Sequence, residues 1–162
     1  MKKQFIFGLM LFSIAFTAQS QNISENALGF RLGSNDGFGG EISYQRKLSK
    51  DNRLEFDLGF RNSNDVNAFK LAGLYQWVMP IEKNFNWYAG VGAGVGSWSY
   101  NKNNNNNSGT FFFAAGDIGI EYNFDIPLQI SLDFRPELYA NTNGYRDNNF
   151  GSDIGLGLRY RF

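Results

Sequence analysis

Residues 53–61 read RLEFDLGFR, in which a leucine or a phenylalanine stands at every second position and polar, charged or small residues stand between them. Successive side chains of a β-strand point to opposite faces of the sheet, so this alternation predicts a strand with one apolar face. The same period of two returns along residues 26–162, in runs separated by Asn, Asp, Gly and Pro. Such turn residues between alternating runs predict an all-β chain.

The alternating runs number eight. They cover residues 28–33, 38–48, 53–61, 69–79, 85–96, 112–124, 128–139 and 150–162. Most have about the 9–11 residues that a tilted membrane strand requires. We expect Pro80 to end the fourth run, because proline cannot donate to the ladder. The connections at 49–52, 80–84 and 125–127 are short, those at 62–67, 101–109 and 141–149 are longer and polar, and only the first outer connection, at 35–37, is tight. Short turns alternating with longer loops are typical of outer-membrane barrels. The predicted fold is therefore an eight-stranded antiparallel up-and-down transmembrane β-barrel.

The N-terminal residues have the pattern of a secretory signal peptide. Lys2 and Lys3 are basic, residues 5–18 are mostly apolar, and residues 18–20 read AQS, with small residues at the cleavage positions. The apolar stretch is 14 residues long, shorter than the ~20 residues of a membrane-spanning helix. We therefore predict a signal peptide at 1–20, an exported chain, and a barrel domain at 21–162.

Composition excludes several kinds of chemistry. The chain has 15 basic and 15 acidic residues, and 13 and 15 after the predicted leader is removed, so nothing favours nucleic acid as a partner. It has no cysteine, which excludes disulfides and thiolate catalysis. It also has no histidine, the side chain that most often performs acid–base catalysis at neutral pH.

Two observations predict that the apolar face points outward, to lipid, rather than into the core of a soluble barrel. The first is volume: an eight-stranded barrel is only just wide enough for side chains to fill it. The apolar face carries most of the bulky residues, whereas the opposite face carries Gly29, Gly33, Gly59, Gly90, Gly92, Gly94, Gly96, Gly119, Gly155 and Gly157.

The second observation is the position of the rings, which gather at both ends of the predicted strands, as in the aromatic belts of membrane barrels. The periplasmic ends carry Tyr44, Tyr75, Trp77, Phe85, Trp87, Tyr122, Phe124, Tyr160 and Phe162, and the outer ends carry Phe38, Phe60, Phe69, Phe112 and Phe150. The middles carry Ile42, Leu58, Leu71, Val91, Ala93, Ile118, Leu132 and Leu156.

The inward face then carries eight acids and seven bases, namely Arg31, Glu41, Lys47, Glu55, Asp57, Arg61, Lys70, Asp117, Glu121, Asp133, Arg135, Glu137, Asp153, Arg159 and Arg161. Buried charges require partners, so we predict a salt-bridge network inside the barrel. An ion-conducting or ligand-binding lumen is the alternative. Asp133 and Glu137 could act as an acid and a base, but charge pairing with Arg135 explains them as well. We predict no catalytic, cofactor-binding or metal-binding residue.

Four local features receive structural interpretations. Residues 90–96 read GVGAGVG, which lacks the G-x-G-x-x-G spacing and the Gly-Lys-Ser/Thr of phosphate-binding loops, so we interpret them as a strand with a small inner face. Asn103 to Asn107 predict a solvated outer loop. Pro136, on the lipid-facing register, predicts a bulge or a frayed outer segment. Arg46 lies close enough to a strand end to reach the interface.

The leader, the eight runs and the ending Leu156-x-Leu158-x-Tyr160-x-Phe162 together resemble the small outer-membrane β-barrel family that includes OmpX-type and OmpA-type barrels. The Ala18-Gln19-Ser20-Gln21 junction and the Asn-rich loops look like exported barrels of Bacteroidetes-type bacteria. The resemblance covers the whole chain and implies an outer-membrane location, and the terminal aromatic resembles the signal that the barrel-assembly machinery recognises. Because the chain ends at Phe162, we expect no periplasmic peptidoglycan-binding domain of the OmpA kind.

Four functions are compatible with these features. We expect a non-enzymatic, monomeric barrel with an envelope-structural, adhesive or surface-interaction role through its outer loops, in contact with outer-membrane lipid and lipopolysaccharide. A narrow channel or a carrier of small or hydrophobic molecules, similar to porins or OmpW, is the second, and a secreted soluble ligand-binding barrel is another. An outer-membrane enzyme is disfavoured, because the known barrel lipases, acyltransferases and proteases look like they rely on histidine.

Overall fold

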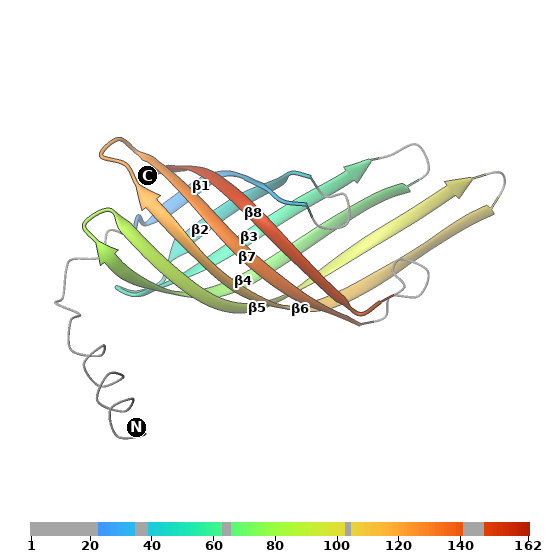
Figure 1. Cartoon of the computed structure of the whole chain (residues 1–162). Coiled ribbons are helices and arrows are strands. Elements are labelled where there is room, and N and C mark those ends of the chain that lie inside the picture. Colours follow the sequence, from blue (N-terminus) through green and yellow to red (C-terminus); the bar gives the residue numbers. More distant parts are fainter. Residues whose placement is uncertain (1–22, 35–38, 63–65, 103–104, 141–147) are drawn as a thin grey trace, which may run out of the picture.

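Figure 1 shows a computed structural model in which residues 23–34, 39–62, 66–102, 105–140 and 148–162 are described. The strands are β1 (Asn26–Leu32), β2 (Glu41–Lys47), β3 (Asn52–Asn62), β4 (Val66–Glu82), β5 (Phe85–Lys102), β6 (Asn105–Asn123), β7 (Leu128–Ala140) and β8 (Phe150–Arg161). Each pairs antiparallel with the next, and β1 pairs with β8, so the sheet closes into a barrel. The predicted fold is confirmed. The predicted leader at 1–20 lies outside the described residues.

All three short connections lie at one end of the barrel, which we call the short-turn end (Figure 1). The first and last strands meet at the same end, where the backbone amide of Asn26 donates to the carbonyl of Phe162 at 3.0 Å and the reverse bond is 2.9 Å. From the short-turn end as far as the pairs Arg31↔Glu41 and Leu32↔Leu156, closure leaves no free strand edge. Hydrocarbon requires such closure because it offers no hydrogen bonds to the backbone. Among the described residues, no helix is long and apolar enough to cross a membrane.

The opposite end, which we call the loop end, is uneven. Strands β5 and β6 have 18 and 19 residues, and their ladder continues as far as the pair Lys102↔Asn105. The prediction of a loop over 101–109 was therefore wrong, since all of these residues except 103–104, which lie outside the described part, are in strands. Polar side chains do not prevent pairing once the register of a hairpin is set, so the ladder continues beyond the apolar wall.

Two prolines behave differently from the prediction. Pro80 does not end β4, which continues to Glu82 through a register shift, and a bulge is one of the places where a strand tolerates proline. The prediction of a bulge or frayed segment at Pro136 was also wrong. Strand β7 continues past it to Ala140, and its pairing with β8 includes Pro136↔Ser152. Proline has no backbone N–H to donate, and the interruption is confined to the β6–β7 ladder. Two residue pairs are absent there, and the pairing then resumes in the same register.

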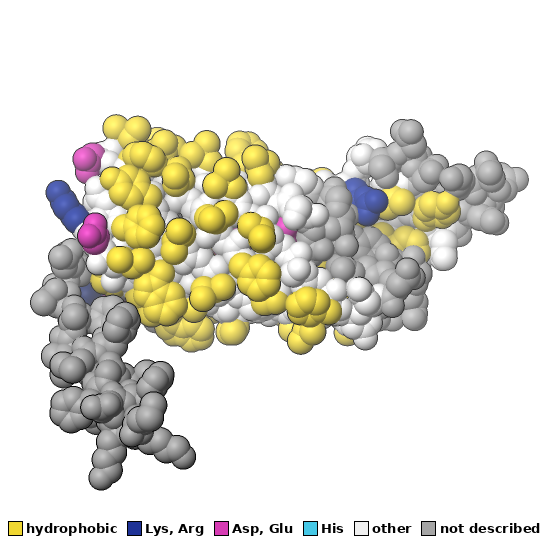
Figure 2. All heavy atoms as spheres, viewed as in Figure 1, with side chains coloured by type: hydrophobic (Ala, Val, Ile, Leu, Met, Phe, Trp, Pro, Cys, Tyr) yellow, Lys and Arg dark blue, Asp and Glu magenta, His cyan; other side chains and the backbone are white. Residues whose placement is uncertain are grey.

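Large apolar side chains cover the outside of the wall. Figure 2 shows hydrophobic side chains spread over one face of the barrel, with the visible basic side chains at its two ends. In the middle of the strands, Val91 is 57% and Ile118 is 51% exposed. A soluble protein would bury such residues in its core, so the predicted outward direction of the apolar face is confirmed.

The predicted aromatic belt at the short-turn end is also present. Its rings contact one another in the pairs Tyr75–Trp77, Phe85–Tyr122, Tyr122–Phe124 and Tyr160–Phe162, with centroids 4.9–6.3 Å apart. At the loop end, Phe60 lies opposite Phe69 in the β3–β4 register, whereas Phe38 is outside the described residues. Arg46, also predicted at an interface, is exposed and donates to Asn26 Oδ1 at 2.8 Å.

The inner face carries glycines where large side chains crowd the lumen. A Cβ atom on Gly92 would lie 2.1 Å from the carbonyl oxygen of Gly73, and one on Gly119 would lie 2.4 Å from the ring of Tyr88. These distances are far below van der Waals contact. The glycines therefore leave space for the large side chains that fill the lumen.

Candidate functional site

The lumen is the candidate site because it holds nearly all of the buried charge. Twelve of the predicted inward charges are at most 5% exposed, namely Arg31, Glu41, Glu55, Asp57, Lys70, Asp117, Glu121, Asp133, Arg135, Glu137, Asp153 and Arg159. Lys47, Arg61 and Arg161 are half-buried. The predicted interior salt-bridge network is confirmed, as the ion pairs below show.

Arg31 links its own strand, β1, to three other strands. Its Nη1 donates to Glu41 Oε2 at 3.0 Å and to Asp153 Oδ2 at 2.7 Å, and its Nε donates to Asp133 Oδ1 at 3.0 Å. The partners come from β2, β8 and β7. A guanidinium presents five N–H donors in a planar fork, which allows one side chain to bind several carboxylates.

Arg135 on β7 binds carboxylates on the opposite wall of the barrel. Its Nη2 donates to Glu55 Oε1 at 3.0 Å and to Asp57 Oδ2 at 2.8 Å, both on β3, and its Nη1 lies 3.6 Å from Glu41 Oε2. Arg159 on β8 lies 3.2 Å from the second oxygen of Glu55. Each arginine reaches across the lumen, so the network ties strands that are not neighbours in the sheet.

Arg53 on β3 is a member of the network that the prediction missed. It is 1% exposed, and its Nε and Nη1 donate to Gln76 Oε1 and Glu121 Oε2, both at 2.6 Å. Its guanidinium also lies 4.8 Å from the ring centroid of Tyr88. The sequence could have predicted that Arg53 points inward, because the alternation places it on the same face as Glu55 and Asp57.

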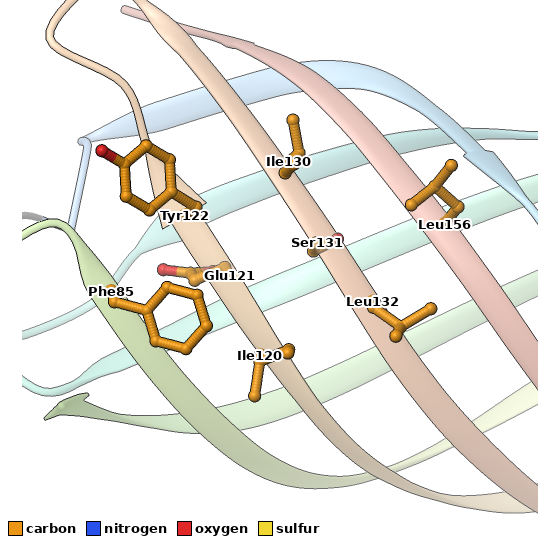
Figure 3. Close-up of a pocket in the computed structure, with 8 residues that line it drawn as sticks. All are labelled: Phe85, Ile120, Glu121, Tyr122, Ile130, Ser131, Leu132 and Leu156. Atoms are coloured by element: carbon orange, nitrogen blue, oxygen red, sulfur yellow. The ribbon is translucent and has the colours of Figure 1, made fainter.

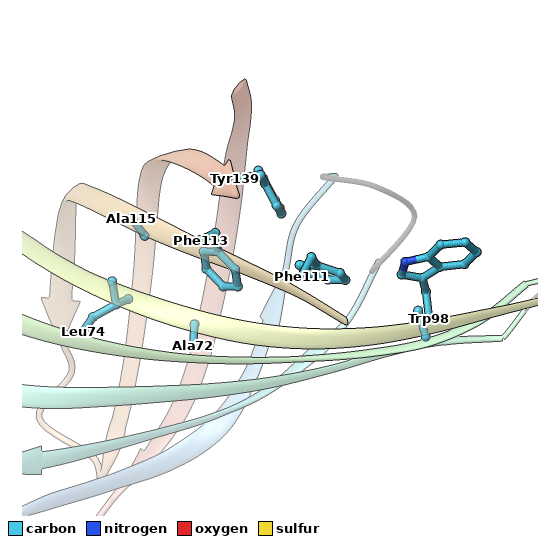
Figure 4. Close-up of a cluster of buried hydrophobic side chains, with 8 residues drawn as sticks. Ala72, Leu74, Trp98, Phe111, Phe113, Ala115 and Tyr139 are labelled. Atoms are coloured by element: carbon cyan, nitrogen blue, oxygen red, sulfur yellow. The ribbon is translucent and has the colours of Figure 1, made fainter. Parts of the chain in front are cut away.

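A second layer of the lumen, nearer the loop end, is apolar. Figure 4 shows Trp98, Phe111, Phe113 and Tyr139 among smaller apolar side chains, and these four rings are at most 5% exposed. We call these four side chains the aromatic layer. The rings of Phe111, Phe113 and Tyr139 have centroids 5.3–6.4 Å apart. Period-two reasoning placed Phe113 and Tyr139 inside, but Trp98 and Phe111 fall outside the predicted runs, so the layer was not foreseen.

Lys70 lies between the two layers. Its Nζ donates to Glu137 Oε1 at 2.8 Å and lies 3.7 Å from Glu41 Oε1. The same ammonium lies 5.2 Å from the ring centroid of Phe113, which is the range of a cation–π contact. The hydroxyl of Tyr139 donates to the other oxygen of Glu137. The ionic network and the aromatic layer are thus continuous.

This arrangement offers little to acid–base chemistry. Asp133 is bound by Arg31, whereas Glu137 is bound by Lys70 and Tyr139, so different cations hold the two carboxylates that could act as acid and base. Within the described ranges, no group of three or more acidic residues is placed to bind a metal ion. The geometry is that of acids and bases held mainly by ion pairs with one another.

Comparison with known proteins identifies the family to which this chain belongs. The family model "Outer membrane protein beta-barrel domain" matches residues 3–162. The chain belongs to the outer-membrane β-barrel family. Its location is therefore the outer membrane, its short-turn end is the periplasmic end, and its loop end is the outer end. No curated protein matches this outer-membrane barrel by sequence.

Solved structures share the fold of this outer-membrane barrel. Neisserial surface protein A is 14% identical with a TM-score of 0.62, and the match covers 85% of this chain and 94% of that one. The N-terminal β-barrel domain of Pseudomonas aeruginosa OprF is 14% identical with a TM-score of 0.59, covering 88% and 100%. Ail, the attachment invasion locus protein of Yersinia pestis, is 18% identical with a TM-score of 0.55, covering 86% and 97%.

Proposed function

We propose that this outer-membrane barrel is a non-enzymatic protein that acts at the cell surface, in adhesion or envelope organisation, through the outer ends of its strands. The observation that carries the proposal is the contrast between the filled lumen and the long outer hairpin of β5 and β6. The lumen is filled by the ionic network and the aromatic layer, whereas the β5–β6 hairpin continues beyond the neighbouring strand β7, whose last pair with β6 is Phe112↔Ala140.

Structural relatives support a surface role. One is named a surface protein and another an attachment invasion locus protein, and the latter has also been crystallised with the heparin analogue sucrose octasulfate. For this chain we infer an analogous arrangement, in which the outer hairpin of β5 and β6 contacts a partner outside the cell while the wall contacts lipid and lipopolysaccharide.

A channel is the second candidate, and the burial of the lumen argues against it. Arg31, Arg135 and Arg159 are each 0% exposed in the middle of the barrel. An eight-stranded barrel has room for packed side chains rather than for a column of water. Enzymatic action is disfavoured by the absence of histidine and by the mutual pairing of the lumen charges.

We propose that residues 1–20, with their basic start and apolar stretch, direct export and are removed. We also propose that the barrel-assembly machinery recognises the lipid-facing aromatic side chains of Tyr160 and Phe162. The mature protein is a monomer. Phe162 is 60% exposed at the periplasmic end, where such a signal is accessible.

Two measurements test the proposal. In planar lipid bilayers, the purified barrel is expected to be electrically silent, and discrete conductance steps would favour the channel. In the second, residues 99–108 are replaced by Asn-Gly, which keeps the register because Trp98 lies opposite Gly109. Cells that display this variant should lose adhesion to immobilised heparin, while a Lys50→Ser variant in the periplasmic turn should retain it. Unchanged adhesion of the shortened barrel contradicts the role of the hairpin.

A further inference from the structure

Within the apolar wall, β6 has a neighbouring strand on each side. Figure 3 shows part of this wall, where Ile120, Leu132 and Leu156 lie on the adjacent strands β6, β7 and β8. At the outer end the arrangement differs. The pairing of β5 with β6 continues as far as Lys102, whereas the pairing of β6 with β7 ends at Phe112, and Figure 1 shows the outer hairpin extending beyond the end of β7. Within the described ranges, the outer part of β6 therefore has no paired strand on its β7 side.

The hydrogen bonds at the end of β7 show which residues of β6 point to this side. The backbone amide of Tyr139 donates to the carbonyl of Asn149 at 2.7 Å, so Tyr139 points to β8 and the next residue, Ala140, points to β6. Successive residues of an antiparallel strand direct their N–H and C=O groups to opposite neighbours. The residue opposite Ala140 therefore points to β7, and so does every second residue before it, including Ser108 and Asn106. We call the β7-facing backbone groups of these two residues the hairpin edge.

The hairpin edge is open to pairing with another strand. No described residue forms a hydrogen bond with the β7-facing groups of Ser108 or Asn106. Proteins commonly protect an exposed edge with lysines, prolines or bulges, because unpaired N–H and C=O groups are a template for another strand. Residues 105–110 read NNNSGT, without a charged side chain or a proline. Their pairing with β5 shows no register shift, so no bulge turns this edge away.

The side chains beside the hairpin edge are small and uncharged. Ser108 and Thr110 are exposed on the outer face of β6, and Asn107, also exposed, is on the alternate face. A strand that lies along the edge would meet hydroxyl groups on one face and an amide on the other, and threonine and serine pairs across strands are stabilising. A charged side chain of the partner would find no ion pair on residues 105–110. The edge therefore fits an extended peptide that is rich in Thr, Ser or Asn and has no charge.

We propose that the hairpin edge binds an extended, uncharged segment of a protein outside the cell, which adds one strand to the sheet beside β6. In this mode of recognition, main-chain hydrogen bonds supply the affinity and side chains at alternate positions supply the selectivity. Ser108 and Asn106 each offer one N–H donor and one C=O acceptor, which pair with a segment of about five residues. This mode of binding rests on the proposed surface role of the outer hairpin.

Binding of a synthetic peptide tests the hairpin edge. The probe is a fluorescent peptide of alternating threonine and asparagine, mixed with the barrel in detergent micelles and followed by fluorescence anisotropy. Wild-type barrel is expected to bind it. Ser108→Pro removes one N–H donor from the hairpin edge and none from the β5–β6 ladder, so it should weaken binding about tenfold, which corresponds to ~1.4 kcal/mol. Ser108→Ala is the matched control, because it removes the hydroxyl group but keeps the backbone donor, and its affinity should stay within about twofold of wild type.

Misfolding is controlled in two ways. Each variant must show the heat-modifiable gel mobility of a closed barrel, and Asn106→Pro is an independent variant at the other end of the hairpin edge. A second peptide, with the same side chains but with N-methyl groups on its central amides, should not bind.

Three results overturn the inference: no peptide bound to wild-type barrel, equal binding by the Ser108→Pro and Ser108→Ala variants, or equal binding of the N-methylated peptide, which would assign the contact to side chains. The proposed surface function fails separately. If replacing the hairpin abolishes adhesion to heparin while Ser108→Pro still binds the peptide as wild type does, the surface role stands and the hairpin edge is rejected.

Discussion

Replacing Arg135 by methionine tests whether the lumen is held together by its ion pairs. Methionine keeps much of the length of the side chain and removes its charge. Of the carboxylates that Arg135 contacts, Glu55 keeps Arg159 at 3.2 Å, and Glu41 keeps Arg31 at 3.0 Å. Asp57 is different, because its only ion pair within the described residues is with Arg135, at 2.8 Å.

The expected magnitude follows from the burial of Asp57. Its side chain is 0% exposed, and its Oδ1 has no hydrogen-bond partner in the described part of the chain. Removing one partner of a buried ion pair costs about 3–5 kcal/mol, because the other charge stays buried and uncompensated. We therefore expect Arg135→Met to lower the free energy of unfolding by ~3–5 kcal/mol. Adding Asp57→Asn removes the stranded charge and should restore ~1–3 kcal/mol as a coupling energy.

The assay is unfolding by guanidinium chloride in lipid vesicles, followed by tryptophan fluorescence and by heat-modifiable gel mobility. Arg46→Met is the control, since Arg46 is exposed and its side chain donates to the amide oxygen of Asn26 without an ion pair to any described residue. It should change stability by less than ~0.5 kcal/mol. If Arg135→Met loses less than ~1 kcal/mol, or if Asp57→Asn gives no recovery, the buried charges do not depend on one another and the reasoning is wrong.

Three further predictions concern the wall and the lumen, each measured by the same unfolding assay. Gly92→Ala should destabilise the barrel by ~1–3 kcal/mol, because its Cβ would meet backbone at 2.1 Å, whereas Gly73→Ala, with 3.5 Å to the nearest atom, should be nearly neutral; equal effects would contradict the crowded lumen. Ile118→Arg, predicted near the bilayer midplane, should cost about 2–4 kcal/mol, and Tyr160→Arg in the periplasmic belt about 0–1 kcal/mol; the opposite order would contradict the orientation. Tyr139→Phe removes a hydrogen bond from a buried carboxylate and should cost ~1–3 kcal/mol; unchanged stability would show that this bond contributes nothing.

Much of this architecture could be predicted from local sequence. In residues 53–61 the alternation assigns every side chain to a face, and the structure keeps each assignment. The reason is geometric, since a strand that is shifted by one residue exchanges its two faces. The same rule directed fifteen charges inward, of which twelve are buried in the lumen, and it could also have placed Arg53 there.

The lengths of the strands could not be read from the same pattern. Polarity predicted a loop at 101–109, and Pro80 predicted a strand end, yet the β5–β6 ladder continues as far as the pair Lys102↔Asn105 and β4 continues to Glu82. Apolar alternation reports only the part of a strand that faces lipid. Backbone pairing continues wherever a partner strand is present. The length of the outer hairpin therefore depends on the pairing of β5 with β6 and cannot be read from either segment alone.

The partners inside the lumen were decided by the tertiary structure alone. Arg31 binds Asp133, which lies 102 residues away, and Arg53 binds Glu121, which lies 68 residues away. Period two directs each of these side chains inward but does not say which ones stand at the same height. That depends on the stagger between successive strands and on the diameter of the closed barrel. The sequence by itself determined which side chains face the lipid and which face the axis, because that choice is local. Closure of the sheet then determined which charges meet, because only a closed ring brings opposite walls within reach of an arginine.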